Sequence, residues 1–171
     1  MSMWKFVQRK HYCLFLSKIP MQNIYEITLT SRRKLLQVIE SHSAEQLNTI
    51  PPGFSNNLIW NIAHIIVVQQ MLVYKLSGLP MSIDEAMVER FKRGTKPQGT
   101  VDGAQIEQIK TLLFETIDQA QTDLAGGNFT NYTEFTTMSG YTIKTAQDAM
   151  AFNLYHEGVH MGIIMQIRKF L

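Results

Sequence analysis

The sequence of 171 residues contains one cysteine, Cys13, so a disulfide framework within the chain is excluded. This cysteine usage fits a reducing compartment, and we expect a cytoplasmic protein. No uninterrupted apolar run approaches the roughly 18 to 20 residues of a membrane span, so no membrane partner is expected. A chain of this length fits one domain that buries its apolar surface in a single core.

The chain also lacks a basic face that would point to nucleic acid. Its formal net charge is +2, but four basic residues and no acidic ones lie in the first twenty positions, and the remainder has 12 basic against 14 acidic residues. This mildly acidic body argues against a nucleic-acid partner. The apolar run 13–16 is too short for a secretory signal. We expect residues 1–20 to be an N-terminal extension of uncertain structure, with an extra element packed on the bundle as the alternative, and residues 21–171 to form the domain.

Four long segments repeat their apolar residues with the period of an α-helix. They cover residues 22–41, 55–77, 102–125 and 146–170, with Ser55 or Asn57 starting the second. The second segment is apolar on every face, so it is expected to be central. Long helices joined by connections of this length predict an all-α four-helix bundle with crossover connections and short accessory helices.

Shorter patterns predict where helices begin. A hydroxyl side chain is followed three residues later by a carboxyl or amide side chain at Ser43–Gln46, Ser82–Glu85 and Thr145–Asp148, which is typical of helix N-termini. The first two predict a short turn and a short crossover helix, and the third predicts the start of the last helix. Residues 128–144 are rich in Thr, Tyr and Phe around Gly140. This favours an irregular loop over a two-stranded ribbon.

Two histidines lie one helical turn apart on the last predicted helix. The spacing of His156 and His160 places both rings on one face, with Cβ atoms about 5 to 6 Å apart. His64 lies on the central helix among apolar neighbours. Three unpaired buried imidazoles cost about 1 to 3 kcal/mol each, and bundle cores commonly build metal sites from facing helices. A shared metal ion is therefore favoured over three hydrogen-bonded core histidines. His11 and His42 are expected to be solvated.

The string from His156 to His160 also matches H-E-x-x-H, the zinc-protease signature. Such a protease takes a further ligand, usually downstream, and residues 161–171 contain no His, Asp, Glu or Cys. The metzincin extension is absent too, so a metallopeptidase is disfavoured. Glu157 lies about 100° round the helix from His156. It is a candidate base or partner of a metal ligand, and a solvated side chain is the alternative.

The histidine-bearing segments resemble those of the DinB/YfiT-like proteins. The resemblance is carried by Trp60, Asn61, Ile62, Ala63, His64, Ile65, His156, His160, Met161, Gly162, Ile163, Ile167 and Arg168. It extends over most of residues 21–171 in the order and spacing of four helices. It implies a bundle that holds a divalent metal, typically nickel or zinc, through His64, His156 and His160. It also implies a homodimer, and activities like those of bacillithiol-dependent or mycothiol-dependent S-transferases and metal-dependent hydrolases.

Three neutral imidazoles leave at least one coordination position open, which is typical of a catalytic site. A metal there would lower the pKa of bound water toward about 7 or deprotonate a bound thiol. We therefore expect a metal-dependent transferase that activates a low-molecular-weight thiol. A hydrolase, or a non-catalytic module that binds metal or a small molecule, is the alternative. The candidate polar side chains for contacting a small-molecule substrate are Asn61, Tyr74, Tyr155 and Gln166, and ordinary helix packing or capping is the favoured alternative for each.

Overall fold

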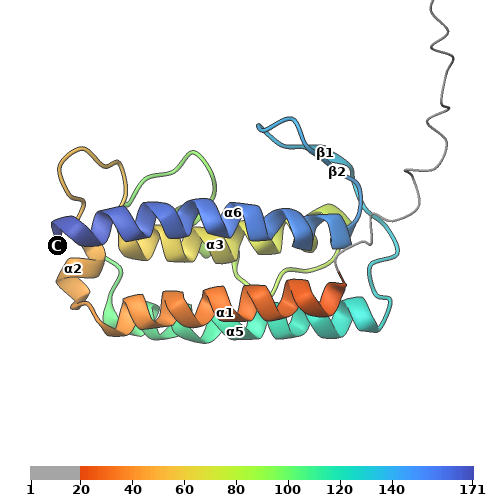
Figure 1. Cartoon of the computed structure of the whole chain (residues 1–171), viewed down its shortest axis with the longest axis horizontal. Coiled ribbons are helices and arrows are strands. Elements are labelled where there is room, and N and C mark those ends of the chain that lie inside the picture. Colours follow the sequence, from red (N-terminus) through yellow and green to blue (C-terminus); the bar gives the residue numbers. More distant parts are fainter. Residues whose placement is uncertain (1–19) are drawn as a thin grey trace, which may run out of the picture.

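The computed structural model describes residues 20–171 (Figure 1). The expected extension, residues 1–20, lies outside this part of the chain except for Pro20, and so does His11. The described elements are α1 (Met21–Glu40), α2 (Ala44–Asn48), α3 (Leu58–Val73), η1 (Lys75–Ser77), α4 (Glu85–Phe91), α5 (Gly103–Ala125), β1 (Phe135–Thr136), β2 (Thr142–Ile143), α6 (Ala146–Ile167) and η2 (Arg168–Phe170). The predicted all-α class is confirmed.

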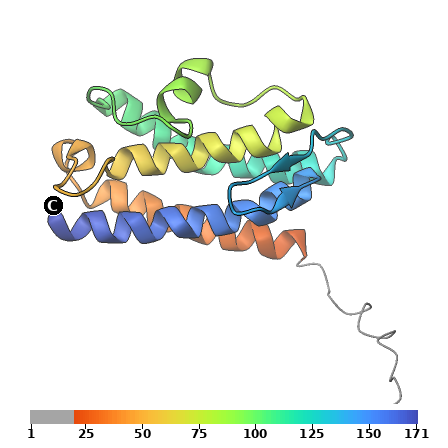
Figure 2. The same ribbon diagram turned by 90° about the horizontal axis from the view of Figure 1, so that it is seen from above.

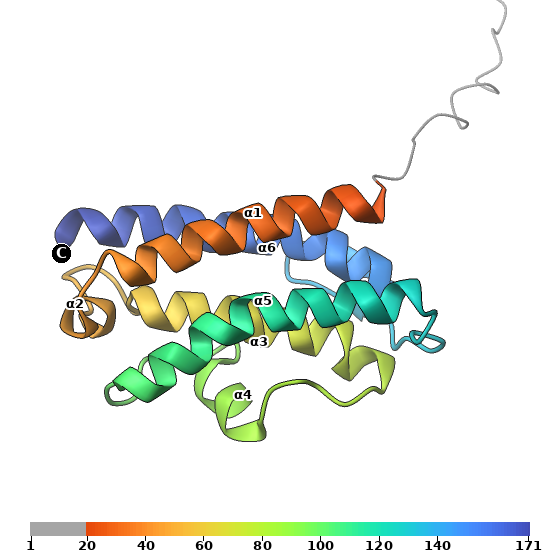
Figure 3. The same ribbon diagram turned by 90° about the horizontal axis from the view of Figure 1, so that it is seen from below.

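The four long helices form a bundle of two layers. In Figure 1, α3 lies beside α6 in one layer and α1 beside α5 in the other, and Figure 3 shows this second layer from below. Contacts between α1 and α6, and between α3 and α5, join the layers. Because α3 and α5 run in the same direction, the segment between them returns along the bundle, and it carries η1 and α4. This is the long crossover that the sequence predicts.

Local side-chain caps explain where several helices begin. The Ser43 hydroxyl accepts from the Gln46 amide while the Gln46 side chain accepts from the Ser43 amide, so this predicted capping box is confirmed. The side chains of Asn57 and Thr145 cap α3 and α6. The predicted box at Ser82 is wrong, because Asp84 caps α4 and the Ser82 amide donates to Gln70 Oε1 at 2.8 Å.

The segment before α6 corrects a second expectation. Residues 128–144 contain a two-stranded ribbon in place of the predicted irregular loop, because β1 and β2 pair antiparallel, with Phe135 opposite Ile143. Cross-strand hydroxyls of Thr136 and Thr142 lie 3.0 Å apart, and Gly140 has a φ of +84° in the turn. This glycine supplies a backbone conformation that other residues adopt only with strain. The ribbon lies over α6 near the start of that helix (Figure 2).

Helix α3 is the centre of the fold, as predicted. The stretch Leu58–Ser77 is long and apolar enough to cross a membrane by composition, but 83% of its apolar window is buried inside the fold. Protein covers its apolar faces, so its hydropathy reflects a core position.

Buried polar side chains divide the apolar core into two clusters. One cluster includes Leu35, Ile66 and Leu113, and the other includes Leu72 and Met150. Along each long helix, buried polar residues lie between the residues of one cluster and those of the other. We call these residues the polar layer: Thr28, Arg32, Gln69, Gln70, Thr116, Asn153 and Glu157. The layer reaches the histidine pair of α6, because Glu157 directly follows His156.

Candidate metal centre

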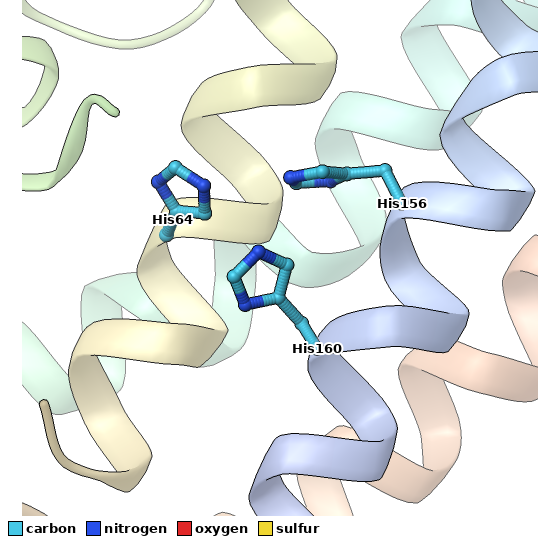
Figure 4. Close-up of side chains that lie close together, drawn as sticks. All are labelled: His64, His156 and His160. Carbon is cyan, nitrogen blue, oxygen red and sulfur yellow. The ribbon is translucent and has the colours of Figure 1, made fainter. Parts of the chain in front are cut away.

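Three imidazoles converge between α3 and α6 (Figure 4). His64 comes from α3, and His156 and His160 come from successive turns of α6. Their nearest ligand nitrogens all lie within 4.8 Å of one another, and the ring centroids are 4.6 to 5.2 Å apart. The three histidines that were predicted to share a metal ion are therefore brought together, and this group could hold one ion.

Two contacts fix the ring of His64. Its Nδ1 lies 2.6 Å from the carbonyl oxygen of Phe91, at the end of α4. Because a carbonyl only accepts, Nδ1 carries the proton and Nε2 keeps its lone pair. The indole of Trp60 stacks on the His64 ring, with ring centroids 4.7 Å apart and planes inclined by 12°. The ring is thus oriented before any ion arrives.

The ring of His160 is held in the same way by Asn61. Nδ1 of His160 lies 2.9 Å from Asn61 Oδ1. The Asn61 amide nitrogen donates to Asn56 Oδ1 at 2.8 Å and to the Asn57 carbonyl at 2.7 Å, which requires its oxygen to face the histidine. His160 therefore donates through Nδ1 and keeps Nε2 for an ion. Asn61 was expected to contact substrate, and the structure places it fully buried behind a candidate metal ligand.

His156 differs from the other two because its buried Nδ1 has no hydrogen-bond partner among the described residues. Burial, followed by the nearby His160, His64 and Arg32, lowers the pKa of His156 to about 3. Burial, followed by the nearby His64, lowers the pKa of His160 to about 4. Burial also lowers the pKa of His64, although its bond to Phe91 opposes the shift. All three rings are neutral near pH 7, the state that metal ligation requires.

Glu157 points into the polar layer. Its Oε1 accepts from Arg32 Nε at 3.0 Å, Arg32 Nη2 at 2.8 Å and Asn153 Nδ2 at 2.7 Å. The residue is 1% exposed, so the alternative of a solvated side chain is wrong. Arg32, the partner of Glu157, was missed from the sequence. The signal was present, because Arg32 follows Ile24 and Thr28 at four-residue steps on the buried stripe of α1.

A cavity of about 380 Å³ opens beside His64 and His156, within the range of small-molecule sites. Besides these rings, it is lined by Val68, Met71, Leu72, Lys92, Arg93, Phe135, Thr137, Met138, Ser139, Phe152, Tyr155 and Val159. Helices α3 and α6, the end of α4 and the ribbon therefore each supply part of the wall. A larger groove of about 1090 Å³ between α1 and α6 contains none of the three histidines.

The predicted substrate contacts are scattered. Of the four, only Tyr155 lines the cavity. Tyr74 donates its hydroxyl to Asp123 at 2.7 Å, and burial, followed by this bond, raises its pKa above the usual range. Gln166 is exposed and accepts from Lys169. Lining residues of the ribbon and of the crossover were missed, because no local pattern indicates which connection returns to the histidines.

The comparisons with known proteins agree with this architecture. The sequence model described as the DinB superfamily matches residues 28–164, a span that contains all three histidines. No curated protein matches the chain.

Proposed function

The chain belongs to the DinB superfamily, and from this membership and the three converging imidazoles we propose that it is a metal-dependent transferase that activates a low-molecular-weight thiol. In this proposal His64, His156 and His160 hold a divalent ion, nickel or zinc. The observation that carries it is the ligand set itself. Two of the rings have Nδ1 bonded to fixed acceptors, so their Nε2 lone pairs are available to one ion.

The protein residues prepare the site in three ways. Phe91 and Asn61 orient two ligand rings. Burial keeps the imidazoles neutral, so no proton must leave before an ion enters. Apolar side chains, among them Phe135, Met138 and Phe152, line the cavity beside the site. A bound divalent ion would supply a Lewis acid that lowers the pKa of a coordinated thiol or water.

Metal content tests the ligand set. We expect about one divalent ion per purified chain, as in other three-histidine sites, and loss of most of it in each single variant His64→Ala, His156→Ala and His160→Ala. His42→Ala is the matched control, because His42 binds the carbonyl of Val38 at the end of α1, outside the cluster. Circular dichroism checks that the helices remain. Full metal retention in the His64 variant would overturn the three-histidine site.

The type of chemistry needs a second measurement. With cobalt in the site, a thiol that reaches the ion changes the visible absorption spectrum, whereas a hydrolase or a non-catalytic binding module need not respond. The spectrum is recorded with and without a low-molecular-weight thiol, at equal cobalt content. An unchanged spectrum at saturating thiol would count against thiol activation and would favour the alternatives.

Two further parts of the proposal come from the composition and the family resemblance. We propose a cytoplasmic location, since the single cysteine fits a reducing compartment. We also propose a homodimer, which sedimentation analysis of the full chain tests directly. A mass that stays at 19.6 kDa over a wide concentration range would refute the dimer.

A further inference from the structure

The charged side chains that line the cavity beside the histidines are all basic. The lining contains Lys92 and Arg93 but no aspartate or glutamate. Three neutral imidazoles would not offset the charge of a divalent ion, so a loaded site adds two further positive charges. A cavity with positive charges and no acidic side chain favours a negatively charged ligand.

Arg93 is the better placed of the two cations. Lys92 binds both carboxylate oxygens of Glu89 at 2.6 Å, so its charge is largely offset. The guanidinium of Arg93 has neither an ion pair nor a hydrogen bond within the described part of the chain. Arg93 follows two residues after Phe91, whose carbonyl holds His64. Arg93 and the candidate ligand His64 both line this cavity.

The remaining wall is apolar and aromatic. Phe152 stacks on Tyr141 of the ribbon, with centroids 6.0 Å apart and planes inclined by 3°, and its centroid lies 5.7 Å from that of Tyr155. This stack attaches the ribbon to α6. Met138, near the ribbon turn, lines the cavity yet is 80% exposed. A flexible thioether without a core to pack in is suited to covering an apolar ligand.

We propose that this cavity takes an organic monoanion with an apolar body, such as a medium-chain or aromatic carboxylate. The anionic group lies between the histidines and Arg93, and the apolar body lies against Phe152 and Met138. Arg93 is then a specificity-determining residue. The inference rests on the proposed function in assigning this cavity as the substrate site, and it adds the class of substrate.

Three probes of equal chain length separate charge from apolar contact. Octanoate, octanol and octylammonium are titrated calorimetrically into the full chain, in metal-loaded and chelator-treated forms, with metal content measured in parallel. We expect octanoate to bind at least tenfold more tightly than octylammonium, with octanol between them. Metal loading should increase the affinity for octanoate. Equal affinities for octanoate and octylammonium would overturn the proposal.

Variants locate the binding. Arg93→Gln should weaken octanoate binding about fivefold in both forms, the worth of a partly exposed charge pair. Arg33→Gln is the matched control, because Arg33 is an exposed arginine on α1 that does not line the cavity. Met138→Ser should weaken octanoate but leave acetate unchanged. Equal effects of the two arginine variants would refute the assignment of Arg93.

The two proposals fail separately in this design. If the chain holds metal but binds the three probes equally, the proposed metal site stands and the proposed substrate class is refuted. If the purified chain holds no metal but still binds octanoate through Arg93, the proposed metal-dependent function is refuted and the proposed anion site stands.

Discussion

The buried pair between Arg32 of α1 and Glu157 of α6 offers the sharpest test of how this core is built. Both side chains are nearly inaccessible, at 0% and 2% exposure, and Arg32 Nη2 lies 2.8 Å from Glu157 Oε1. Glu157→Gln removes the charge that faces Arg32 while conserving shape. The variant leaves an uncompensated buried cation, so we expect a loss of about 3 to 5 kcal/mol in the free energy of unfolding.

This loss is a large fraction of the total free energy of unfolding, because small domains are stable by only about 5 to 15 kcal/mol. Arg32→Met should have a loss of similar size, since it leaves a buried carboxylate with Asn153 as its remaining partner. The double variant Arg32→Met/Glu157→Leu removes both charges and should lose much less than the sum of the two single losses. A coupling energy of about 3 kcal/mol or more is expected.

Urea unfolding of the chelator-treated chain measures these energies without the contribution of bound metal. The matched control is Glu107→Gln, because Glu107 pairs with Lys110 at 2.6 Å but its side chain is 70% exposed. That variant should change the stability by less than about 1 kcal/mol. Additive losses in the double variant, or a loss below about 1 kcal/mol for Glu157→Gln, would refute the reasoning.

Three further predictions concern the site and its helices. Asn61→Ala should lower metal affinity about 10- to 100-fold with little loss of helicity, because His160 loses the acceptor that orients it. Competition with a chelator measures the metal affinity, and an unchanged affinity would contradict this role of Asn61. The metal-free chain should lose thermal stability as the pH falls from about 6.5 toward the lowered pKa values of about 3 for His156 and about 4 for His160. The reason is that the unfolded histidines bind protons in this pH window, whereas the folded ones do not. A melting temperature that does not depend on pH in this window, or that depends on it equally in His156→Gln, would argue against buried neutral rings. Thr145→Ala should lower the free energy of unfolding by about 1 kcal/mol, because it removes the side-chain cap of α6. Thermal melts measure this loss, and Thr111→Ala on the exposed face of α5 is the matched control.

The parts of the structure that could be predicted from sequence rest on short-range patterns. The four-residue spacing of His156 and His160 fixes their common face once α6 forms. The all-round apolar character of α3 predicts its central position, and with it the burial of His64. Caps such as Ser43 and Asn57 are local too, since donor and acceptor lie within one turn.

What could not be predicted depends on contacts between distant segments. Arg32 and Glu157 are separated by 125 positions, and the place of Arg32 on the buried stripe of α1 does not identify its partner. The choice of Asp84 over Ser82 as the cap of α4 depends on Gln70 of α3, which takes the amide of Ser82. Arg93 reaches the cavity because the crossover returns over α3. None of these pairings leaves a periodic signal in the chain.

The stack of Trp60 on His64 provides the protein with an internal optical reporter. The sequence contains two tryptophans, Trp4 and Trp60, so Trp4→Phe leaves the emission of Trp60 alone. With its indole centroid 4.7 Å from the ring of a candidate ligand, Trp60 would lie close to any bound ion. Zinc has a filled d shell, whereas nickel has an open one that quenches excited indole at short range. Fluorescence titration can therefore distinguish the two ions while it measures their affinities.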